Sequence, residues 1–523
     1  MSFINRFEKG AYSFERKYVN KNLTSKNDEL TEKRLEYWKN FLKDGFENYS
    51  KFMNENLNGE FDNIIELLSE ENFSVKKTKS ITDWFDMIED LKSDIAKDIK
   101  LPDLHIKNEN NEKTAPIFYN FYIPFLKLAL FRLNSRINDF NIPQKVVNQF
   151  VIQLLEKLIN ISYRTLILEL NVAKEEGKLK GENKEERYKY FSEKYVEDKF
   201  WEYLEEYPVM FRLMSETIYD WIDNTFGFFD NFYRDIDELV KSFGVSNVIE
   251  SVDLSISDSH NNGKSVVIVH TDNGKSVVYK PRSLKLDKVF QETIKTFNRL
   301  VGSVLYSIEV IDKEDYGWSE YISHKACSDE IEVGDYYEEL GELLFILYIL
   351  RGNDIHYENI IAYGSHPVLI DLETIFHNKA MYSSIETASD EIYEMIEKSV
   401  KRVGILPSLV WGKEGKSGVD ISAMTNEDDK EIPIESASIS GILTDEMKIS
   451  YRTSFLEKKN NNPFIKEKTI DLSKYRKNLK SGFMNTYKKI LQDNSKEKLV
   501  EEIGKYKNLF SRQIMRQLSF IHL

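Results

Sequence analysis

Four polar side chains in the second half of the sequence have the types and the order that phosphoryl transfer requires. Lys280 ends a run rich in β-branched and aromatic residues, which predicts a strand with an ammonium group at its end. Asp354 and Asn359 lie five residues apart, and Asp371 follows twelve residues after Asn359. An ammonium group can hold phosphate oxygens, one carboxylate can accept a hydroxyl proton, and an amide oxygen and a second carboxylate can bind Mg²⁺.

The spacing of these residues has a physical reason. A loop of this length can direct Asp354 at a substrate hydroxyl and fold the amide oxygen of Asn359 back onto a metal ion. A short hairpin can then return Asp371 to the same ion. Protein kinases carry this pattern as H-R-D-x-x-x-x-N with a later Asp. Here His356 lies inside the loop, an order that resembles lipid and phosphoinositide kinases more than Ser/Thr protein kinases.

Each of these residues, taken alone, has a simpler interpretation. Lys280 can be an ordinary lysine of an edge strand, and Asp354 and His356 can be turn or loop residues. Asp371 can cap the N-terminus of a following helix. Because the residues occur together, in kinase order and beside expected strands, we favour the phosphoryl-transfer interpretation.

The composition predicts a large globular protein of several domains. The 523 residues carry a formal net charge of −15, and 41% of them are hydrophobic and 13% aromatic, too many for a disordered chain. The low content of Gly (22) and Pro (10) favours long helices. One cysteine excludes a disulfide framework and fits a reducing cytosol, so we expect a cytoplasmic protein. The acidic balance argues against a general nucleic-acid-binding protein, and we expect neither a signal peptide nor a membrane span.

The hydrophobic pattern changes once, near residue 245. Before this point apolar residues recur every three or four positions, which predicts helices over 22–59, 147–168, 183–207 and 210–243. After it, β-branched runs predict strands over 265–270, 276–280, 304–311 and 318–322. The helices expected in this half cover 286–300, 335–351, 481–491 and 495–520.

A second hairpin is expected from 360–362 and 368–372 around Gly364, followed by an irregular region to about residue 450. We therefore predict an α+β fold. It comprises a large helical N-terminal domain (1–244) and a two-lobed, lipid-kinase-like catalytic core, with an N-lobe over 245–340 and a C-lobe over 341–523.

Longer motifs around these residues resemble the dehydratase domain of class II lanthipeptide synthetases, the LanM type. The principal motifs are SDSH (257–260), YKPRSL (279–284), YGW (316–318), GNDIHYENIIA (352–362) and PVLIDLET (367–374). GILP (404–407) and DIS (420–422) match later parts of the same pattern. The resemblance is firm over about 245–421 and more general elsewhere.

The resemblance implies two reactions in one site. ATP, with Mg²⁺, would phosphorylate Ser or Thr in a ribosomally made precursor peptide, and phosphate elimination, a lyase step, would leave dehydroalanine or dehydrobutyrine. The resemblance implies that Lys280, Arg282 and Glu373 bind ATP, and that Asp354, assisted by His356, acts on the substrate hydroxyl. It also implies that Asn359 and Asp371 bind Mg²⁺. For phosphate elimination it implies Asp258, His260 and Arg512.

Two departures from the family pattern concern the later steps. Leu518 stands where the family has the Thr of an R-x-x-x-R-x-T helix. The C-terminal cyclase is also not expected in this chain, so a separate cyclase is a candidate partner. Three functions stay open: a bifunctional lanthipeptide dehydratase, a peptide Ser/Thr kinase that stops at phosphorylation, and a non-catalytic peptide-binding module.

Overall fold

The computed structural model describes residues 16–18, 29–42, 73–75, 79–107, 113–254, 262–377, 388–411, 418–427, 430–456, 459–466, 468, 470–492 and 495–512. The chain divides into two compact units. The first unit comprises residues 1–231 together with 259–264 and 440–448, and the second unit comprises 232–258, 265–439 and 449–523. The mixture of helices and antiparallel strands confirms the α+β prediction.

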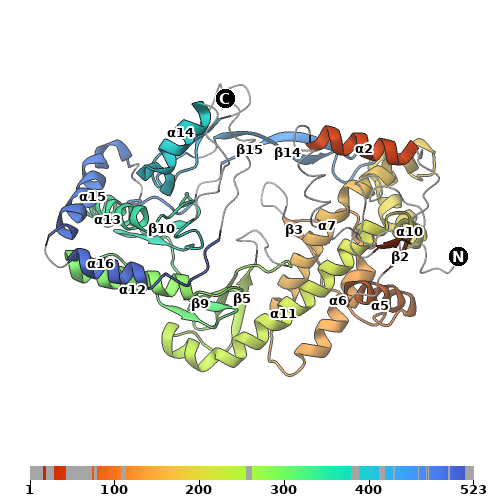
Figure 1. Cartoon of the computed structure of the whole chain (residues 1–523). Helices are drawn as coiled ribbons and strands as arrows, with labels where there is room; N and C mark the ends of the chain where they lie inside the picture. Colours follow the sequence, from red (N-terminus) through yellow and green to blue (C-terminus); the bar gives the residue numbers. More distant parts are fainter. Residues whose placement is uncertain are drawn as a thin grey trace. The chain divides into compact units, whose positions relative to one another are not determined.

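The first unit is mainly helical, as expected (Figure 1). Its helices are α2 (Glu29–Leu42), α5 (Lys79–Ser93), α6 (Tyr119–Ile137), α7 (Gln144–Glu175), α8 (Lys184–Tyr190), α9 (Val196–Asp198), α10 (Phe200–Glu206) and most of α11 (Pro208–Phe243). The helix expected over 183–207 is interrupted by a π-helical turn, Phe191–Tyr195. Two strand pairs that the sequence did not predict are β1 (Arg16–Tyr18) with β2 (Phe73–Val75) and β3 (Ile106–Lys107) with β4 (Lys113–Thr114). Within the described residues, no helix combines the length and the apolarity needed to cross a membrane.

A long hairpin lies in the region that was expected to be irregular, so that expectation was wrong. It consists of β14 (Glu431–Ser440) and β15 (Lys448–Phe455). Serines and glutamates between the isoleucines of β14 gave this segment the composition of a loop, although its cross-strand bonding makes it a strand. The turn of the hairpin belongs to the first unit, where the fully buried carboxylate of Asp445 accepts hydrogen bonds from Arg187 (2.5 Å) and Lys174 (3.3 Å).

The second unit contains one five-stranded antiparallel sheet with the order β5-β6-β7-β9-β8. The strands are β5 (Ile249–Asp253), β6 (Val267–Thr271), β7 (Ser276–Lys280), β8 (Val310–Asp312) and β9 (Gly317–Glu320). The helix α12 (Lys285–Val301) connects β7 to β8. The structure thus confirms the predicted strands around 265–280 and the predicted helix, whereas β8 is shorter than expected and β5 was not singled out.

The YGW motif has a structural role in this sheet. Trp318 is fully buried, and its Nε1 donates a hydrogen bond to Asp235 at 2.9 Å. A Cβ atom at Gly317 would lie 2.6 Å from the carbonyl oxygen of Ile311, so the adjacent strand leaves no space for a side chain there. These contacts explain the motif by packing rather than by catalysis.

The helical part of the second unit packs around α13 (Glu330–Ile349) and α15 (Arg476–Ile490), which lie side by side in Figure 1. Glycines permit a very close approach of their backbones: a Cβ atom at Gly341 would overlap the carbonyl oxygen of Leu479, and one at Gly482 would overlap that of Glu338. α13 starts earlier than expected because Asp329 caps it, accepting from the amides of Ile331 and Glu332.

The remaining elements of this unit connect the site residues. The hairpin of β10 (Ile360–Tyr363) and β11 (His366–Leu369) pairs Ile360 with Leu369 at one end and Tyr363 with His366 at the other. Further elements are α14 (Ala388–Glu397), β12 (Leu409–Trp411), β13 (Gly418–Asp420) and α16 (Ser495–Gly504). The helix expected over 495–520 was therefore too long: α16 ends at Gly504, a poor helix former, and Arg512 lies beyond it.

Candidate active site

Lys280 lies at the end of β7, the third strand of the sheet, where its ammonium group meets two oxygens. The Nζ atom donates to the carbonyl oxygen of Ile370 at 2.6 Å and lies 3.5 Å from the carboxylate of Asp287 in the first turn of α12. Lys280 is 7% exposed and Asp287 2%. Because Ile370 directly precedes Asp371, this contact brings the strand lysine to the loop of the predicted metal ligand.

Arg282 joins these groups into one charged cluster. Its guanidinium donates to Asp287 at 2.7 Å and lies 2.5 Å from Glu373 and 3.4 Å from Asp371. Burial alone would lower the pKa of Arg282, but Asp287 and then Glu373 and Asp371 outweigh it and raise that pKa above its ordinary value. Conversely, burial opposes ionisation of Asp287, but Lys280 and Arg282 lower its pKa.

Arg512 reaches the same cluster from the C-terminal part of the chain. Its backbone amide donates to the carbonyl oxygen of Glu373 at 2.8 Å, and its guanidinium lies 3.4 Å from the Glu373 carboxylate. The cluster thus holds three cationic side chains, Lys280, Arg282 and Arg512, and three carboxylates, those of Asp287, Asp371 and Glu373. A site with this balance can accept an anionic phosphate chain together with a divalent cation.

The loop after α13 folds around the backbone of Asp354. The carbonyl oxygen of Asp354 accepts from the side-chain amide of Asn359 at 2.8 Å and from the backbone amide of His356 at 3.1 Å. Since the Nδ2 atom of Asn359 is engaged, its Oδ1 atom is the one that can bind a metal ion. The backbone of Asn359 in turn accepts from the amide of Ile370 at 3.0 Å, which ties the loop to the strand end before Asp371.

The backbone of this loop is strained and is held by its surroundings. Asp354 has φ = 61°, and Arg351 and Phe376, on either side of the loop, also occupy the left-handed region, with φ = 52° and 58°. Non-glycine residues in this region cost about 1 kcal/mol or more each. Such conformations persist where neighbouring structure determines them, and they concentrate at functional sites.

The later motifs of the resemblance supply this support. The amide of Ile355 donates to Val403, and the amide of Tyr357 donates to Ile421 within the DIS motif. Gly404 begins the GILP motif with φ = 94°, and a Cβ atom there would lie 2.9 Å from the carbonyl oxygen of Ile355. These two motifs therefore hold the backbone of the loop in place and do not add reactive side chains.

His356 is held inside the loop by polar contacts. Its Nδ1 atom lies 3.1 Å from the carbonyl oxygen of Asp354, and its Nε2 atom lies 3.3 Å from Glu358, which is itself 3.5 Å from Lys459. Burial would lower the pKa of His356, but Glu358 and Asp354 raise it above its usual value. The protonated imidazole can therefore fix the loop and add positive charge next to Asp354.

The donor atoms present fit Mg²⁺ better than a transition metal. Asn359 and Asp371 offer oxygen atoms, and Mg²⁺ commonly takes one or two protein ligands and completes its octahedron with phosphates and water. In the part of the chain that the structure describes, no group of three or more His, Cys, Asp or Glu side chains gathers as a metal site. The Asp371 carboxylate also accepts a hydrogen bond from the backbone amide of Glu373 at 3.2 Å. The simpler interpretation of Asp371, as a capping residue, therefore accounts for this one contact.

Three sequence-derived assignments lie outside the described residues: Asp258 and His260 of the SDSH motif, and Leu518. In contrast, the sequence reasoning missed Asp287, the buried partner of both Lys280 and Arg282. A carboxylate in the first turn of the helix that follows the lysine strand was the available signal, because kinases pair that lysine with a carboxylate on the next helix.

Comparison with known proteins places these residues within a recognised sequence family. A protein-family model described as "Domain of unknown function (DUF4135)" matches residues 207–519, which include the whole charged cluster. The chain is also 28% identical over 291 residues to the lacticin 481/lactococcin biosynthesis protein LcnDR2 of Lactococcus lactis subsp. lactis. The match covers 53% of this chain and 31% of that protein, so it spans about a third of the relative. The two findings confirm the resemblance to LanM-type synthetases, and the chain belongs to the DUF4135 family.

Proposed function

We propose that the chain acts in lanthipeptide maturation by transferring phosphate from ATP to Ser or Thr of a precursor peptide. The observation that carries the proposal is the Lys280 ammonium group, which contacts both Asp287 and the residue before Asp371. Kinases place such a lysine on the third strand, pair it with a carboxylate of the following helix and hold the metal with a nearby Asp and Asn. The sheet order and the position of α12 support a kinase-like core. The partner here is an Asp in the first helical turn rather than a Glu.

The roles of the side chains follow from their positions. Lys280 and Arg282 would neutralise the phosphates of ATP, and Asn359 and Asp371 would hold Mg²⁺, which supplies further charge neutralisation when bound. Asp354 would accept the proton of the substrate hydroxyl while that oxygen bonds to the γ-phosphorus and the bond to the ADP oxygen breaks. This arrangement works mainly by positioning and charge.

A second candidate function is supported by one sequence observation. Elimination removes an α-proton and expels phosphate, and it needs groups that hold the departing phosphate. Arg512 lies beside Glu373 and can supply one such group, but Leu518 offers no hydroxyl where the resembling family has Thr. A peptide kinase that accumulates phosphopeptide is therefore the alternative to a complete dehydratase.

Mass spectrometry tests both functions. The protein is incubated with Mg-ATP and peptides encoded by the small reading frames that neighbour its gene, since a precursor with a Ser/Thr/Cys-rich core is the expected substrate. A mass gain of one phosphate supports the kinase, and loss of one water supports the dehydratase. Asp354→Asn should abolish both products, whereas Asp253→Asn, on an exposed strand end, should not. Absence of both products with every peptide and with no ATP binding would contradict the proposal.

A further inference from the structure

An irregular segment of the second unit, residues 459–466, contacts several elements around the candidate active site. We call it the Asn segment, because it contains three consecutive asparagines at positions 460–462. These residues belong to no helix or strand, but the side chain of Asn461 is only 3% exposed. A buried side-chain amide requires hydrogen-bond partners, so the partners of Asn461 show what the segment holds in place.

The side chain of Asn461 holds a stretch of backbone that lies next to the loop after α13. Its Nδ2 atom donates to the carbonyl oxygens of Ala423 at 3.0 Å and of Thr425 at 2.8 Å. Both N–H groups of this amide are therefore engaged. The Nδ2 atom of Asn462 also donates to the carbonyl oxygen of Thr425. The two asparagines thus attach the Asn segment to residues 423–425.

This stretch of backbone in turn supports the loop that carries Asp354. The backbone amide of Tyr357 donates to the carbonyl oxygen of Ile421, and Ser422 forms an isolated β-bridge with His356. Asp354 has φ = 61°, a conformation that persists only where neighbouring structure imposes it. A movement of the supporting backbone would therefore displace Asp354 as well.

The backbone of the Asn segment contacts the hairpin that leads to Asp371. The amide of Ala362, in β10, donates to the carbonyl oxygen of Asn460 at 2.8 Å. The hydroxyl of Tyr336, in α13, donates to the carbonyl oxygen of Asn461 at 2.6 Å and is buried. β10 pairs with β11, which ends two residues before Asp371. The Asn segment thus connects the support of the loop with the hairpin of the predicted metal ligand.

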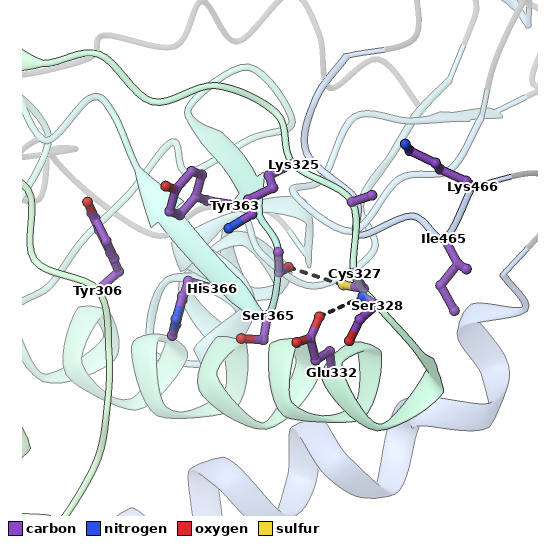
Figure 2. Close-up of a pocket in the computed structure, with 12 residues that line it drawn as sticks. Tyr306, Lys325, Cys327, Ser328, Glu332, Tyr363, Ser365, His366, Ile465 and Lys466 are labelled. Atoms are coloured by element: carbon purple, nitrogen blue, oxygen red, sulfur yellow. Dashed lines mark hydrogen bonds between the residues drawn. The ribbon is translucent and has the colours of Figure 1, made fainter.

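The C-terminal end of the Asn segment is fixed independently of Asn461. The amide of Cys327 donates to the carbonyl oxygen of Phe464 at 2.8 Å, and the Cys327 thiol donates to the carbonyl oxygen of Gly364 at 3.2 Å. Figure 2 shows Cys327 and Ile465 among the residues that line a pocket of about 710 Å³. Because this end has its own contacts, removing the Asn461 side chain should break one internal connection rather than release the whole segment.

We infer that Asn461 is a positioning residue for phosphate transfer, because it fixes the loop of Asp354 relative to the hairpin that leads to Asp371. Its hydrogen bonds end on backbone carbonyl groups, so it acts through the backbone and not on the substrate. Displacing a reacting group by about 1 Å can lower a rate about 100-fold. The inference rests on the proposed function for the reaction affected, but the connection itself can be measured without a substrate.

Amide hydrogen exchange followed by mass spectrometry, without ATP or peptide, tests the connection. Asn461→Ala removes two buried hydrogen bonds and should accelerate exchange in fragments covering residues 351–359 at least about tenfold. Tyr336→Phe loses one hydroxyl and should accelerate it about fivefold. Asn460→Ala is the matched control and should leave exchange unchanged, because Asn460 accepts from Ala362 through its backbone carbonyl, which the substitution keeps.

The rate of phosphate transfer distinguishes positioning from a merely structural role. Leu499→Ala is the stability control, because this buried leucine lies in α16, which packs on α12 and α15. At a temperature at which all variants are folded by circular dichroism, Asn461→Ala should lower kcat at least about tenfold and change KM for ATP less than about threefold. Leu499→Ala should keep kcat and lower only the melting temperature.

The outcomes separate this inference from the proposed function. Exchange that is unchanged in residues 351–359 of Asn461→Ala, or that rises evenly over the whole unit as in Leu499→Ala, would overturn the inference. Faster exchange of the loop with an unchanged kcat would overturn it too, since the loop would then not need this connection. A failure of the proposed function shows differently: the unsubstituted protein transfers no phosphate, while the exchange pattern still supports or overturns the connection between Asn461 and the loop.

Discussion

Replacing Asp287 by Asn should destabilise the second unit and weaken ATP binding. The Asp287 side chain is nearly buried and lies within 3.5 Å of both Lys280 and Arg282. Removing one partner from a buried ion pair costs about 3–5 kcal/mol. Arg282 keeps Glu373 and Asp371 as partners, so we expect the low end of that range, about 3 kcal/mol.

The assay is urea unfolding followed by intrinsic fluorescence at neutral pH, together with titration of Mg-ATP. Asp253→Asn is the control, since Asp253 pairs with His270 at the surface and should contribute at most about 1 kcal/mol. Because the pKa of Asp287 is lowered in the folded state, its contribution is present at neutral pH and is lost as the pH falls through that pKa. Equal unfolding curves for the two variants at neutral pH would refute the view that Asp287 compensates the charges of Lys280 and Arg282.

Three further predictions concern the metal ligands, the helix crossing and a buried acid. Asn359→Ala and Asp371→Asn should each lower phosphate transfer at least about 100-fold with an unchanged circular dichroism spectrum; near-normal transfer would disprove the metal assignment. Gly341→Ala should cost about 2–3 kcal/mol by overlap with α15, whereas Gly227→Ala, in open space on α11, should stabilise by up to about 1 kcal/mol; similar melting temperatures would contradict the close approach. Burial raises the pKa of Glu339 to about 7, and that of its histidine partner is also raised, so the folded state binds more protons and stability should fall from about pH 5 to above pH 7. Glu339→Gln should flatten this dependence, and an unchanged pH profile in urea unfolding would argue against it.

The sequence predicted the elements whose signals are local. The strand ending at Lys280, the helix after it and the hairpin before Asp371 all follow from β-branched runs, periodicity and turn residues, and the structure contains them. The contact between Lys280 and Ile370 joins residues 90 positions apart, so no local pattern could supply it.

The errors have equally specific causes. The β14–β15 hairpin lacks a continuous apolar run, so its composition resembled that of a loop. The length of α16 was overestimated because its periodicity was extended past Gly504. Asp287 was missed although a carboxylate in the first turn of the helix after the lysine strand is the partner that kinases use. Its burial beside Lys280 and Arg282, in contrast, cannot be deduced from the charge pattern alone.

The residues with positive φ around Asp354 mean that this loop would not keep its conformation if it were moved alone into another protein. A peptide carrying residues 351–359 would relax, because isolated Arg351 and Asp354 would leave the φ values of 52° and 61° that they hold here. Protein engineers who graft this loop into another scaffold would also have to transfer its distant supports, the segments around Val403 and Ile421. The conformation of this loop thus depends on three separate segments of the chain, and all three would have to be transferred together.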